Sequence, residues 1–362
     1  MRKNDFELTV LLPCLNEEET IKICILKAKN CIRENNLNAE ILVADNGSSD
    51  NSISIARKNG ARVVSIKEKG YGSALIGGTK EAKGKYCIMA DSDDSYDFSS
   101  LMPYIEKLRE GYDLVMGNRF MGGIADGAMP FLHRYLGTPV LSFLGRALFN
   151  NKIGDYNCGM RGYNTKRILE LNLNCSGMEY ASEMIVKSSI YGYKICEVPT
   201  KLKKDGRSRK PHLNTWKDGW RHLIFMLKHA PKQVFFMTSI VFALISLFLL
   251  CSIKTDNIIV PYLFLMFSLL GILLFMLYLF SMIIAYKNNY LPFNDGLEKK
   301  IILKLYNSDS IFFIGLILLP ISIFSLLIFK TTKIILVFTV LTFLSLILMF
   351  SDIYINIIKS IK

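Results

Sequence analysis

The chain has 362 residues, 51% of them hydrophobic, which is long enough for two domains. Its formal net charge of +13 at pH 7 is spread unevenly, because lysine and arginine concentrate between residues 201 and 232, directly before the first long apolar run. The eight cysteines include no Cys-x-x-Cys pair and no histidine at metal-ligand spacing, which argues against a cysteine-based metal site and favours reduced, mostly buried thiols.

Up to about residue 232, apolar runs rich in β-forming residues alternate with segments of helical period. This alternation predicts a parallel sheet whose strands are joined by crossover helices. In such sheets ligands bind beyond the carboxyl ends of the strands, so the residues directly after each run are the first candidates for a site. The predicted strands are 8–12, 41–44, 62–66, 86–90 and 114–116.

Polar turns follow the first three predicted strands. Pro13 cannot donate to a strand ladder and is expected to end the first strand, after which Asn16 is expected to cap a helix. In the second turn, 45–50, Gly47 allows a tight bend and the Ser and Asp residues cap the next helix. The third turn, 69–72, reads Lys-Gly-Tyr-Gly and either brings backbone N–H groups near a phosphate or is a plain turn, the commoner case. The chain lacks a Walker Gly-x-x-x-x-Gly-Lys and a full Gly-x-Gly-x-x-Gly, which argues against a P-loop ATPase or a dinucleotide dehydrogenase.

The fourth predicted strand leads into an acidic stretch, Asp91–Asp97, for which four interpretations compete. An EF-hand loop fails because the required glycine and the final glutamate are missing. A phosphatase-type Asp-x-Asp nucleophile lacks obvious partners, and a solvated turn is the plainest alternative. The fourth interpretation is a divalent-metal site for a nucleotide diphosphate, because Mg²⁺ and Mn²⁺ take oxygen ligands and typically use one or two carboxylates together with substrate phosphates.

Taken in order, the turns resemble those of a known family. The set is Pro13…Asn16-Glu17, Asp45-Asn46-Gly47-Ser48-Ser49-Asp50, Lys69-Gly70-Tyr71-Gly72, Asp91-Ser92-Asp93 and Gly117-Asn118-Arg119. Over residues 6–230 the chain resembles family 2 glycosyltransferases with the GT-A fold, and more narrowly the polyprenol-phosphate (dolichol-phosphate) hexosyltransferases. The resemblance implies an α/β, Rossmann-like GT-A domain for nucleotide-diphospho-sugar transfer, which we place at residues 1–212.

The same resemblance implies roles for individual residues. Asp91 and Asp93 would form an Asp-x-Asp pair that holds Mg²⁺ or Mn²⁺, with Asp93 the more direct ligand, and Arg119 would lie near the donor or acceptor phosphates. Two departures from the family pattern leave the donor open: Asn46 stands where a second acidic residue is usual, and Asp-Ser-Asp-Asp-Ser replaces Asp-Ala-Asp-Leu-Gln. The residues implied to bind the nucleotide-sugar are Pro13, Asn16, Glu17, Asp45, Lys69, Gly70 and Asp91.

The chemistry of the acceptor determines which other side chains are needed. A lipid monophosphate is already an anion at neutral pH, so it requires positioning and charge neutralisation, which arginine supplies with a bidentate fork. A sugar hydroxyl would instead require a carboxylate base, for which Asp155 is the candidate. Glu179 and Glu183 are as readily explained by a capped turn or an ion pair. The predicted catalytic group is Asp93, Arg119, Asp155 and Arg161, and the predicted acceptor-phosphate contacts are Arg134, Arg207 and Arg209.

The last third of the chain is expected to be an all-α membrane domain, residues 233–362. Its apolar runs are close to the roughly 20 residues that a helix needs to cross a bilayer, and buried core helices are the weaker alternative. Residues 213–232 precede it as a predicted amphipathic juxtamembrane helix, on which Trp216 and Trp220 share one face. The four predicted transmembrane helices are 234–253, 258–286, 311–329 and 334–354.

The sequence thus favours a membrane-anchored, inverting glycosyltransferase that moves a hexose from a nucleotide-sugar of the UDP-glucose or GDP-mannose class to polyprenyl phosphate. No apolar leader precedes the α/β part, and lysines 287, 299, 300 and 304 lie in one inter-helix loop, so the active site is expected on the cytoplasmic face. The alternatives are transfer to a sugar hydroxyl in polysaccharide synthesis and a non-catalytic nucleotide-sugar-binding scaffold. We predict no nucleic-acid partner, and homo-oligomer formation is left open.

Overall fold

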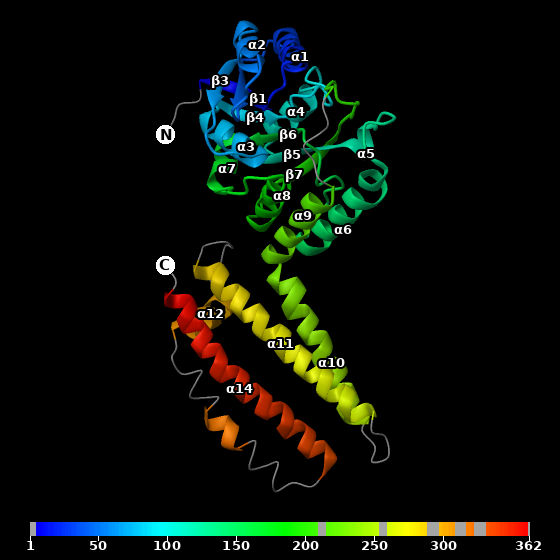
Figure 1. Cartoon of the computed structure of the whole chain (residues 1–362), viewed down its shortest axis with the longest axis vertical. Coiled ribbons are helices and arrows are strands. Elements are labelled where there is room, and N and C mark those ends of the chain that lie inside the picture. The colour runs from blue at the N-terminus through cyan, green and yellow to red at the C-terminus, as the bar shows by residue number, and fades with distance from the viewer. Residues whose placement is uncertain are drawn as a thin grey trace. The chain divides into compact units, whose positions relative to one another are not determined.

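The computed structural model describes residues 5–208, 215–252, 259–287, 297–307, 316–321 and 331–360. The chain divides into two compact units, Met1–Met226 and Leu227–Lys362. The first unit combines a sheet with helices, and the second is helical over its described residues (Figure 1). The division falls inside helix α9 (Thr215–His229), which contains most of the predicted amphipathic segment.

The first unit is built on one mixed sheet. Its seven strands lie in the order β3-β2-β1-β4-β6-β5-β7. Strand β6 runs antiparallel to β4 and β5, whereas the other neighbouring pairs are parallel. The five predicted strands correspond to β1–β5, but the expected purely parallel sheet is wrong because of β6. The strands are β1 (Phe6–Cys14), β2 (Ala39–Asp45), β3 (Arg62–Ser65), β4 (Gly84–Met89), β5 (Leu114–Asn118), β6 (Arg161–Asn164) and β7 (Ile195–Pro199).

Helices cover both faces of this sheet (Figure 1). Leu8, Val10 and Leu12 of β1 alternate with residues on the opposite face and pack in one buried cluster with α1, α2 and α4. On the other face α3 contacts β1 and β2, and α7 contacts β4 and β6. The helices of this unit before α9 are α1 (Ile21–Glu34), α2 (Ser52–Lys58), α3 (Tyr71–Glu81), α4 (Met102–Arg109), α5 (Arg119–Gly122), the π-helix η1 (His133–Gly137), α6 (Thr138–Phe149), α7 (Thr165–Glu170) and α8 (Tyr180–Ile190).

Strand β1 does not end at Pro13, contrary to the sequence expectation. It continues to Cys14, with Pro13 opposite Ala44 of β2. The carbonyl of Leu11 accepts from Ala90 N at 3.4 Å, so alternate residues of β1 direct their polar backbone groups toward β4. The nitrogen of Pro13 therefore faces the space beyond the end of β4, where no strand partner needs a donor.

All eight cysteines are free, and five of them are buried, as predicted.

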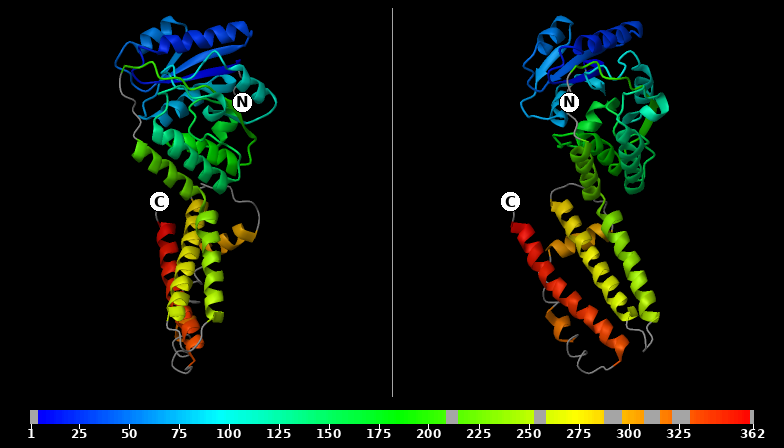
Figure 2. Two further views of the ribbon diagram at one scale, coloured as in Figure 1. Left: turned by 90° about the vertical axis from the view of Figure 1, so that its right-hand side faces the viewer. Right: turned by 45° about the vertical axis from the view of Figure 1, so that its right-hand side comes forward.

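The second unit contains long apolar helices. Helices α10 (Met237–Ser252) and α11 (Ile259–Lys287) run side by side in opposite directions (Figures 1 and 2). Among the described residues, Lys232–Ser252 and Ile259–Lys287 are long and apolar enough to cross a membrane, each with mean hydropathy 2.6. The unit also contains the π-helix η2 (Lys232–Phe236), α12 (Leu297–Asn307) and α14 (Thr332–Ser360).

Four membrane spans are not confirmed. The predicted span 311–329 lies largely outside the described residues. The predicted span 334–354 falls within α14, where the apolar stretch Ile334–Leu348 is shorter than the two long helices. The first two predicted spans, by contrast, coincide with Lys232–Ser252 and Ile259–Lys287.

Candidate active site

The candidate site lies where the chain changes direction across the sheet. From β1 the chain passes to β2 and β3 on one side and then returns to β4 on the other, so a crevice forms beyond the carboxyl ends of β1 and β4. A pocket of about 680 Å³ lies there, and we call it the acidic pocket. Its lining contains Asn46, Tyr71 and Met178 together with seven predicted site residues. Those seven are Pro13, Glu17, Lys69, Gly70, Asp91, Asp93 and Arg207.

Three carboxylates line the acidic pocket, those of Glu17, Asp91 and Asp93, together with the cationic side chains Lys69, Arg207 and Arg221. Burial raises the pKa of Asp91 to about 6, with a further contribution from the charge of Asp93, while a hydrogen bond from Tyr71 opposes the rise. The carboxylate of Asp93 accepts from the Oγ of Ser95 at 2.6 Å and from Arg207 at 2.6 Å. An added cation would relieve the electrostatic cost of ionising Asp91.

The other two carboxylates of the acidic stretch have different partners. Asp94 adopts a positive φ of 62° and forms an ion pair with Lys27. Asp97 accepts from the backbone N–H and the hydroxyl of Ser99, at 3.1 and 2.6 Å. Four similar carboxylates in the sequence therefore separate into two that line the acidic pocket and two that stabilise the local fold.

The acidic pocket offers two neighbouring carboxylates to a divalent cation but no complete set of protein ligands. No group of three or more His, Cys, Asp or Glu side chains within the described ranges is arranged to hold a metal ion. Asp91 and Asp93 both line the acidic pocket and can supply carboxylate oxygens. This pattern fits Mg²⁺ or Mn²⁺, which bind through one or two carboxylates and complete their coordination with water and phosphate oxygens.

Asn16 and Asp45, two of the predicted nucleotide contacts, form hydrogen bonds with the turn after β2. Asn16 has a φ of 58° and accepts from Ser49 N at 2.8 Å, so it does not cap α1, whose N-cap position is Thr20. Asp45 accepts from the N–H groups of Gly47 and Ser48, at 3.0 and 3.1 Å. Neither side chain is among those lining the acidic pocket, and contact with a nucleotide stays a prediction for both.

Asn46 binds the loop that begins α3. Its amide nitrogen donates to Glu68 O at 2.7 Å and to Ile66 O at 3.2 Å, and its amide oxygen accepts from Gly70 N at 2.8 Å. Lys69 closes the same turn by donating from Nζ to the Asn46 carbonyl at 2.7 Å. Asparagine can both donate and accept in this arrangement, whereas an ionised aspartate can only accept.

The glycines of this loop serve close packing. The N–H of Gly72 donates to Ser176 O at 2.9 Å, and that of Ser73 shares the same acceptor at 3.3 Å. A Cβ on Gly70 would lie 2.2 Å from Ser176 O, and one on Gly72 would lie 2.0 Å from Cys175 O. Because the N–H groups of Gly70, Gly72 and Ser73 already have acceptors, the structure favours a packed turn over a phosphate cradle.

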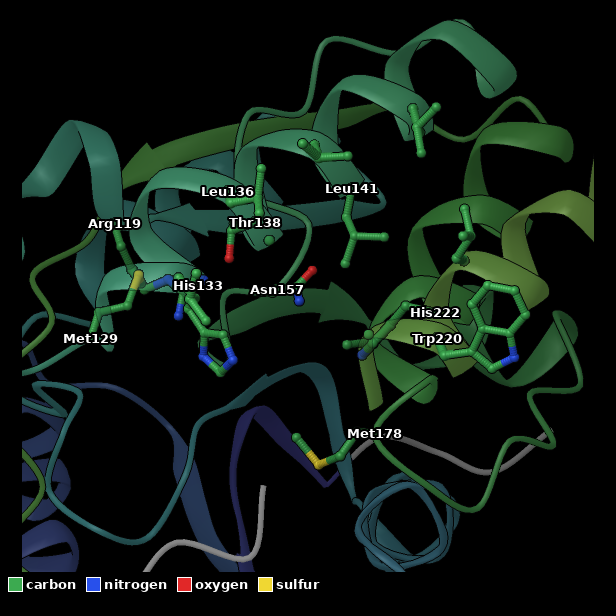
Figure 3. Close-up of a pocket in the computed structure, with 17 residues that line it drawn as sticks. Arg119, Met129, His133, Leu136, Thr138, Leu141, Asn157, Met178, Trp220 and His222 are labelled. Carbon is green, nitrogen blue, oxygen red and sulfur yellow. The ribbon is translucent and has the colours of Figure 1, made fainter. Parts of the chain in front are cut away.

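A second cavity, of about 480 Å³, is mostly apolar, and we call it the apolar cavity (Figure 3). Arg119, His133 and Asn157 lie around one part of it, and Trp220 and His222 lie around another (Figure 3). The Oδ1 atom of Asn157 is buried and has no hydrogen-bond partner within the described residues. Met178 lines both the apolar cavity and the acidic pocket, so the two spaces adjoin.

Arg119 is fixed at the wall of the apolar cavity by Asp155. The guanidinium donates to both carboxylate oxygens of Asp155 at 2.7 Å, and the backbone N–H of Arg119 donates to the same carboxylate at 3.1 Å. Asp155 is fully buried and also accepts from Asn157 N at 3.3 Å. Such a bidentate pair fixes the plane of the guanidinium. Asp155 thus positions Arg119, and removing a proton from a substrate would require breaking this pair.

Two histidines, His133 and His222, line the apolar cavity. Burial, and then the positive charge of Arg119, lower the pKa of His133. His222 lies buried and shares a 2.8 Å hydrogen bond between its Nδ1 and the Oγ of Ser182. A lowered pKa favours the neutral form of His133, which has one donor and one acceptor nitrogen.

The other predicted arginines are placed differently. Arg161 is fully buried and donates to the carbonyls of Tyr156, Cys158 and Ala181, a set of contacts that braces the protein interior. Arg134 lies over the ring of Tyr135, 5.6 Å from its centroid. Arg207 is in the acidic pocket, on the side of Asp93, and not in the apolar cavity. Arg209 lies outside the described residues.

Sequence reasoning assigned no role to several residues that line these spaces. Asn157, Met178 and His222 are far apart along the chain, but all three line the apolar cavity. Arg221 lines the acidic pocket although it belongs to the predicted amphipathic helix. Glu183 proves to be structural: it accepts from Asn174 N and Cys175 N and pairs with Lys187 at 2.8 Å.

Comparison with known proteins places the chain in a family. Residues 9–170 match the model of "Glycosyl transferase family 2". An uncharacterized glycosyltransferase of Mycobacterium tuberculosis is 31% identical over 191 residues, which is 53% of this chain and 83% of that protein. The chain therefore belongs to glycosyltransferase family 2 and is a transferase enzyme.

Two relatives come from Haloferax volcanii. The low-salt glycan biosynthesis hexosyltransferase Agl6 is 35% identical over 229 residues, which is 63% of this chain and 55% of Agl6, so the chain spans little more than half of that relative. A dolichyl-phosphate hexose transferase is 29% identical over 193 residues, covering 53% of this chain and 81% of the relative.

Solved structures confirm the GT-A fold of the first unit. Glucosyl-3-phosphoglycerate synthase from Mycobacterium tuberculosis, in complex with Mn²⁺, uridine diphosphate and phosphoglyceric acid, matches with a TM-score of 0.50 and 20% identity. The match covers 62% of this chain and 78% of the synthase. At this identity the likeness concerns the fold alone.

Proposed function

We propose that the chain transfers a hexose from a nucleotide-sugar of the UDP-glucose or GDP-mannose class to a polyprenyl phosphate. The observation that carries the proposal is the pairing of two adjoining spaces of opposite character. The acidic pocket presents carboxylates suited to a metal-bound diphosphate, and the apolar cavity presents hydrocarbon side chains with Arg119 at its wall. A lipid phosphate is the acceptor whose anionic head and apolar chain match that second space.

Known proteins support the donor and metal assignments. The glucosyl-3-phosphoglycerate synthase of the same fold was solved with uridine diphosphate and Mn²⁺. The names of the Haloferax volcanii relatives specify a hexose transferase and, in one case, dolichyl phosphate. In this chain the matching cation would be held by Asp91 and Asp93, and the diphosphate would complete its coordination.

On the acceptor side, Arg119 is the anchor for the lipid phosphate. Its orientation is fixed by Asp155, so little side-chain entropy is lost when an anion binds. The amide of Asn157 donates to a phosphate oxygen, and its Oδ1 atom, which lacks a partner within the described residues, accepts from a sugar hydroxyl. A neutral His133 adds one more hydrogen-bond donor without competing for the anion.

The proposed reaction needs no general base. A phosphate oxygen of the lipid attacks the anomeric carbon from the face opposite the diphosphate. The bond from that carbon to the diphosphate oxygen breaks, and its electron pair leaves with the nucleoside diphosphate, so the configuration inverts. A bound divalent cation supplies positive charge that stabilises the departing diphosphate. Since the carboxylate of Asp155 is already engaged by Arg119 and Asn157, a phosphate acceptor fits this site better than a hydroxyl acceptor does.

The surface beside the apolar cavity suits contact with a membrane. Phe131, Tyr135 and Phe143 are 74%, 61% and 61% exposed on the segment that contains η1 and α6, and Trp220 of α9 is 63% exposed. Tyrosine and tryptophan rings favour the headgroup layer of a bilayer, and phenylalanine rings beside them can enter its apolar boundary. Together with the two long apolar helices, they support an integral membrane protein, and we place the active site on the cytoplasmic face.

Membranes from cells that express the full chain test the proposal. They are incubated with Mn²⁺ and labelled UDP-glucose, GDP-mannose or UDP-N-acetylhexosamine, and the lipid extract is analysed for a labelled lipid-linked sugar. We expect one donor to give such a product and Asp93→Asn to abolish it while membrane insertion is retained. Absence of a labelled lipid from every donor would refute the proposal.

A further inference from the structure

Arg207 lies where positive charge is needed in the acidic pocket. Its guanidinium donates to Asp93 Oδ2 at 2.6 Å and to Glu17 Oε1 at 3.3 Å, and Asp205 Oδ2 accepts from its Nε at 3.1 Å. The side chain is only 15% exposed. Arg207 thereby links Glu17, which follows β1, to Asp93, which follows β4.

The segment that carries Arg207 is bound along the edge of the acidic pocket, and we call residues 203–208 the strap. At one end Lys203 N donates to Ser95 O at 2.9 Å, and in the middle Gly206 N donates to Asp93 O at 2.8 Å. At the other end Ser208 donates from both its N–H and its hydroxyl to Glu19. These contacts hold the guanidinium against Asp93 without help from any ligand.

This arrangement leaves little of the Asp93 carboxylate available. Its Oδ1 accepts from the N–H and the hydroxyl of Ser95, at 3.1 and 2.6 Å, and its Oδ2 accepts from Arg207. A divalent cation that coordinates Oδ2 would lie close to the guanidinium, and the repulsion between the two positive charges in this mostly buried site favours displacement of Arg207.

The geometry points to Arg207 as a resident counter-ion that the metal replaces only when a nucleotide diphosphate arrives with it. The anionic diphosphate offers the displaced guanidinium a new bidentate partner, whereas metal alone offers it none. Metal and nucleotide would then bind together, and Arg207 would act on the donor side of the site and not on the acceptor phosphate. This inference depends on the proposed function for the identity of the displacing ligand, a metal-bound nucleoside diphosphate.

Binding of Mn²⁺ to the full-length, detergent-solubilised chain tests the exchange directly. The free-ion signal in electron paramagnetic resonance is measured during titration with and without UDP or GDP. For the wild type we expect weak binding of Mn²⁺ alone and much tighter binding with nucleotide. Arg207→Gln removes the competing cation and should tighten the binding of Mn²⁺ alone by about tenfold, the equivalent of one charge-assisted hydrogen bond.

Matched variants separate this exchange from general effects of charge and folding. Lys203→Gln removes the same charge from the strap at a side chain 4.0 Å from Asp97, so it should leave Mn²⁺ affinity unchanged. Arg207→Lys retains a cation without the fork and should fall between wild type and Arg207→Gln. Unchanged or weaker Mn²⁺ binding in Arg207→Gln would overturn the exchange. Wild-type Mn²⁺ binding in Asp93→Asn would instead overturn the metal site of the proposed function.

Discussion

Changing Asn46 to aspartate should damage the fold around the acidic pocket, even though an acidic residue is usual at this position in the family. In the structure the amide nitrogen of Asn46 donates to the carbonyls of Ile66 and Glu68. An ionised carboxylate cannot donate, so both carbonyls would lose their partner and face a negative charge. Of the hydrogen bonds that the Asn46 side chain forms, only the one from Gly70 N, at 2.8 Å, would remain.

The size of the effect follows from these contacts. Each buried polar group left unsatisfied costs about 1–3 kcal/mol, so Asn46→Asp should lower the free energy of unfolding by about 3 kcal/mol. In a unit of this size each kcal/mol corresponds to about 2–4 °C, which predicts a fall of about 6–12 °C in Tm. Nucleotide affinity should fall as well, because the same loop carries Lys69 and Gly70 in the wall of the acidic pocket.

Thermal unfolding of the full chain in detergent, followed by circular dichroism, measures the first effect, and calorimetric titration with UDP and GDP measures the second. Asn30→Asp is the matched control, because it makes the same substitution at an exposed position where the side-chain oxygen accepts from Arg33, a contact that aspartate keeps, and it should change stability by less than about 0.5 kcal/mol. Lowering the pH should partly rescue Asn46→Asp, since a protonated carboxyl can donate one bond. An Asn46→Asp protein with wild-type Tm and nucleotide affinity would refute the role of these contacts.

Three further predictions address charge, backbone packing and the apolar cavity. Mn²⁺ affinity, measured by titration, should fall as the pH is lowered through about 6, because the Asp91 carboxyl then takes up a proton. The pKa of Asp91 in the folded protein lies above its ordinary value, so melting curves of the metal-free protein should show a loss of stability as the pH rises toward about 6. Gly72→Ala should disrupt the packed turn, because its Cβ would lie 2.0 Å from Cys175 O, whereas Gly219→Ala has no atom within 4 Å and should melt like the wild type. Leu136→Trp, at the wall of the apolar cavity, should raise the KM for the lipid acceptor and leave the KM for the donor unchanged; equal changes in both would contradict separate donor and acceptor spaces.

Much of the fold follows from the alternation of apolar runs and helical segments. That pattern predicts β1–β5, and the rule that ligands bind at carboxyl ends of strands predicts that Glu17, Asp91 and Asp93 meet in one pocket. Strand β6 could not be predicted in the same way, because it is only four residues long and contains Arg161 and Gly162. Its antiparallel direction arises from where the chain returns between β4 and β5.

The sequence predicts the residue types of the site better than their roles. The sequence alone does not distinguish Arg119, Arg161 and Arg207. In the structure Arg119 lines the apolar cavity, Arg161 is buried and donates to interior carbonyls, and Arg207 pairs with Asp93. Asp155 resembles a base in the sequence, and only its contacts with Arg119 show that its oxygens are engaged. Such distinctions depend on contacts between residues far apart in the chain, which local patterns do not contain.

The nature of the acceptor is tested most directly by a choice between two lipids. The purified full chain is given Mn²⁺, the labelled donor that membranes use, and either polyprenyl phosphate or the corresponding polyprenol. We predict a labelled lipid from the phosphate only, because Arg119 is the proposed anchor for an anion and both oxygens of the Asp155 carboxylate are engaged by Arg119. Labelling of the polyprenol but not of the phosphate would contradict the proposed function.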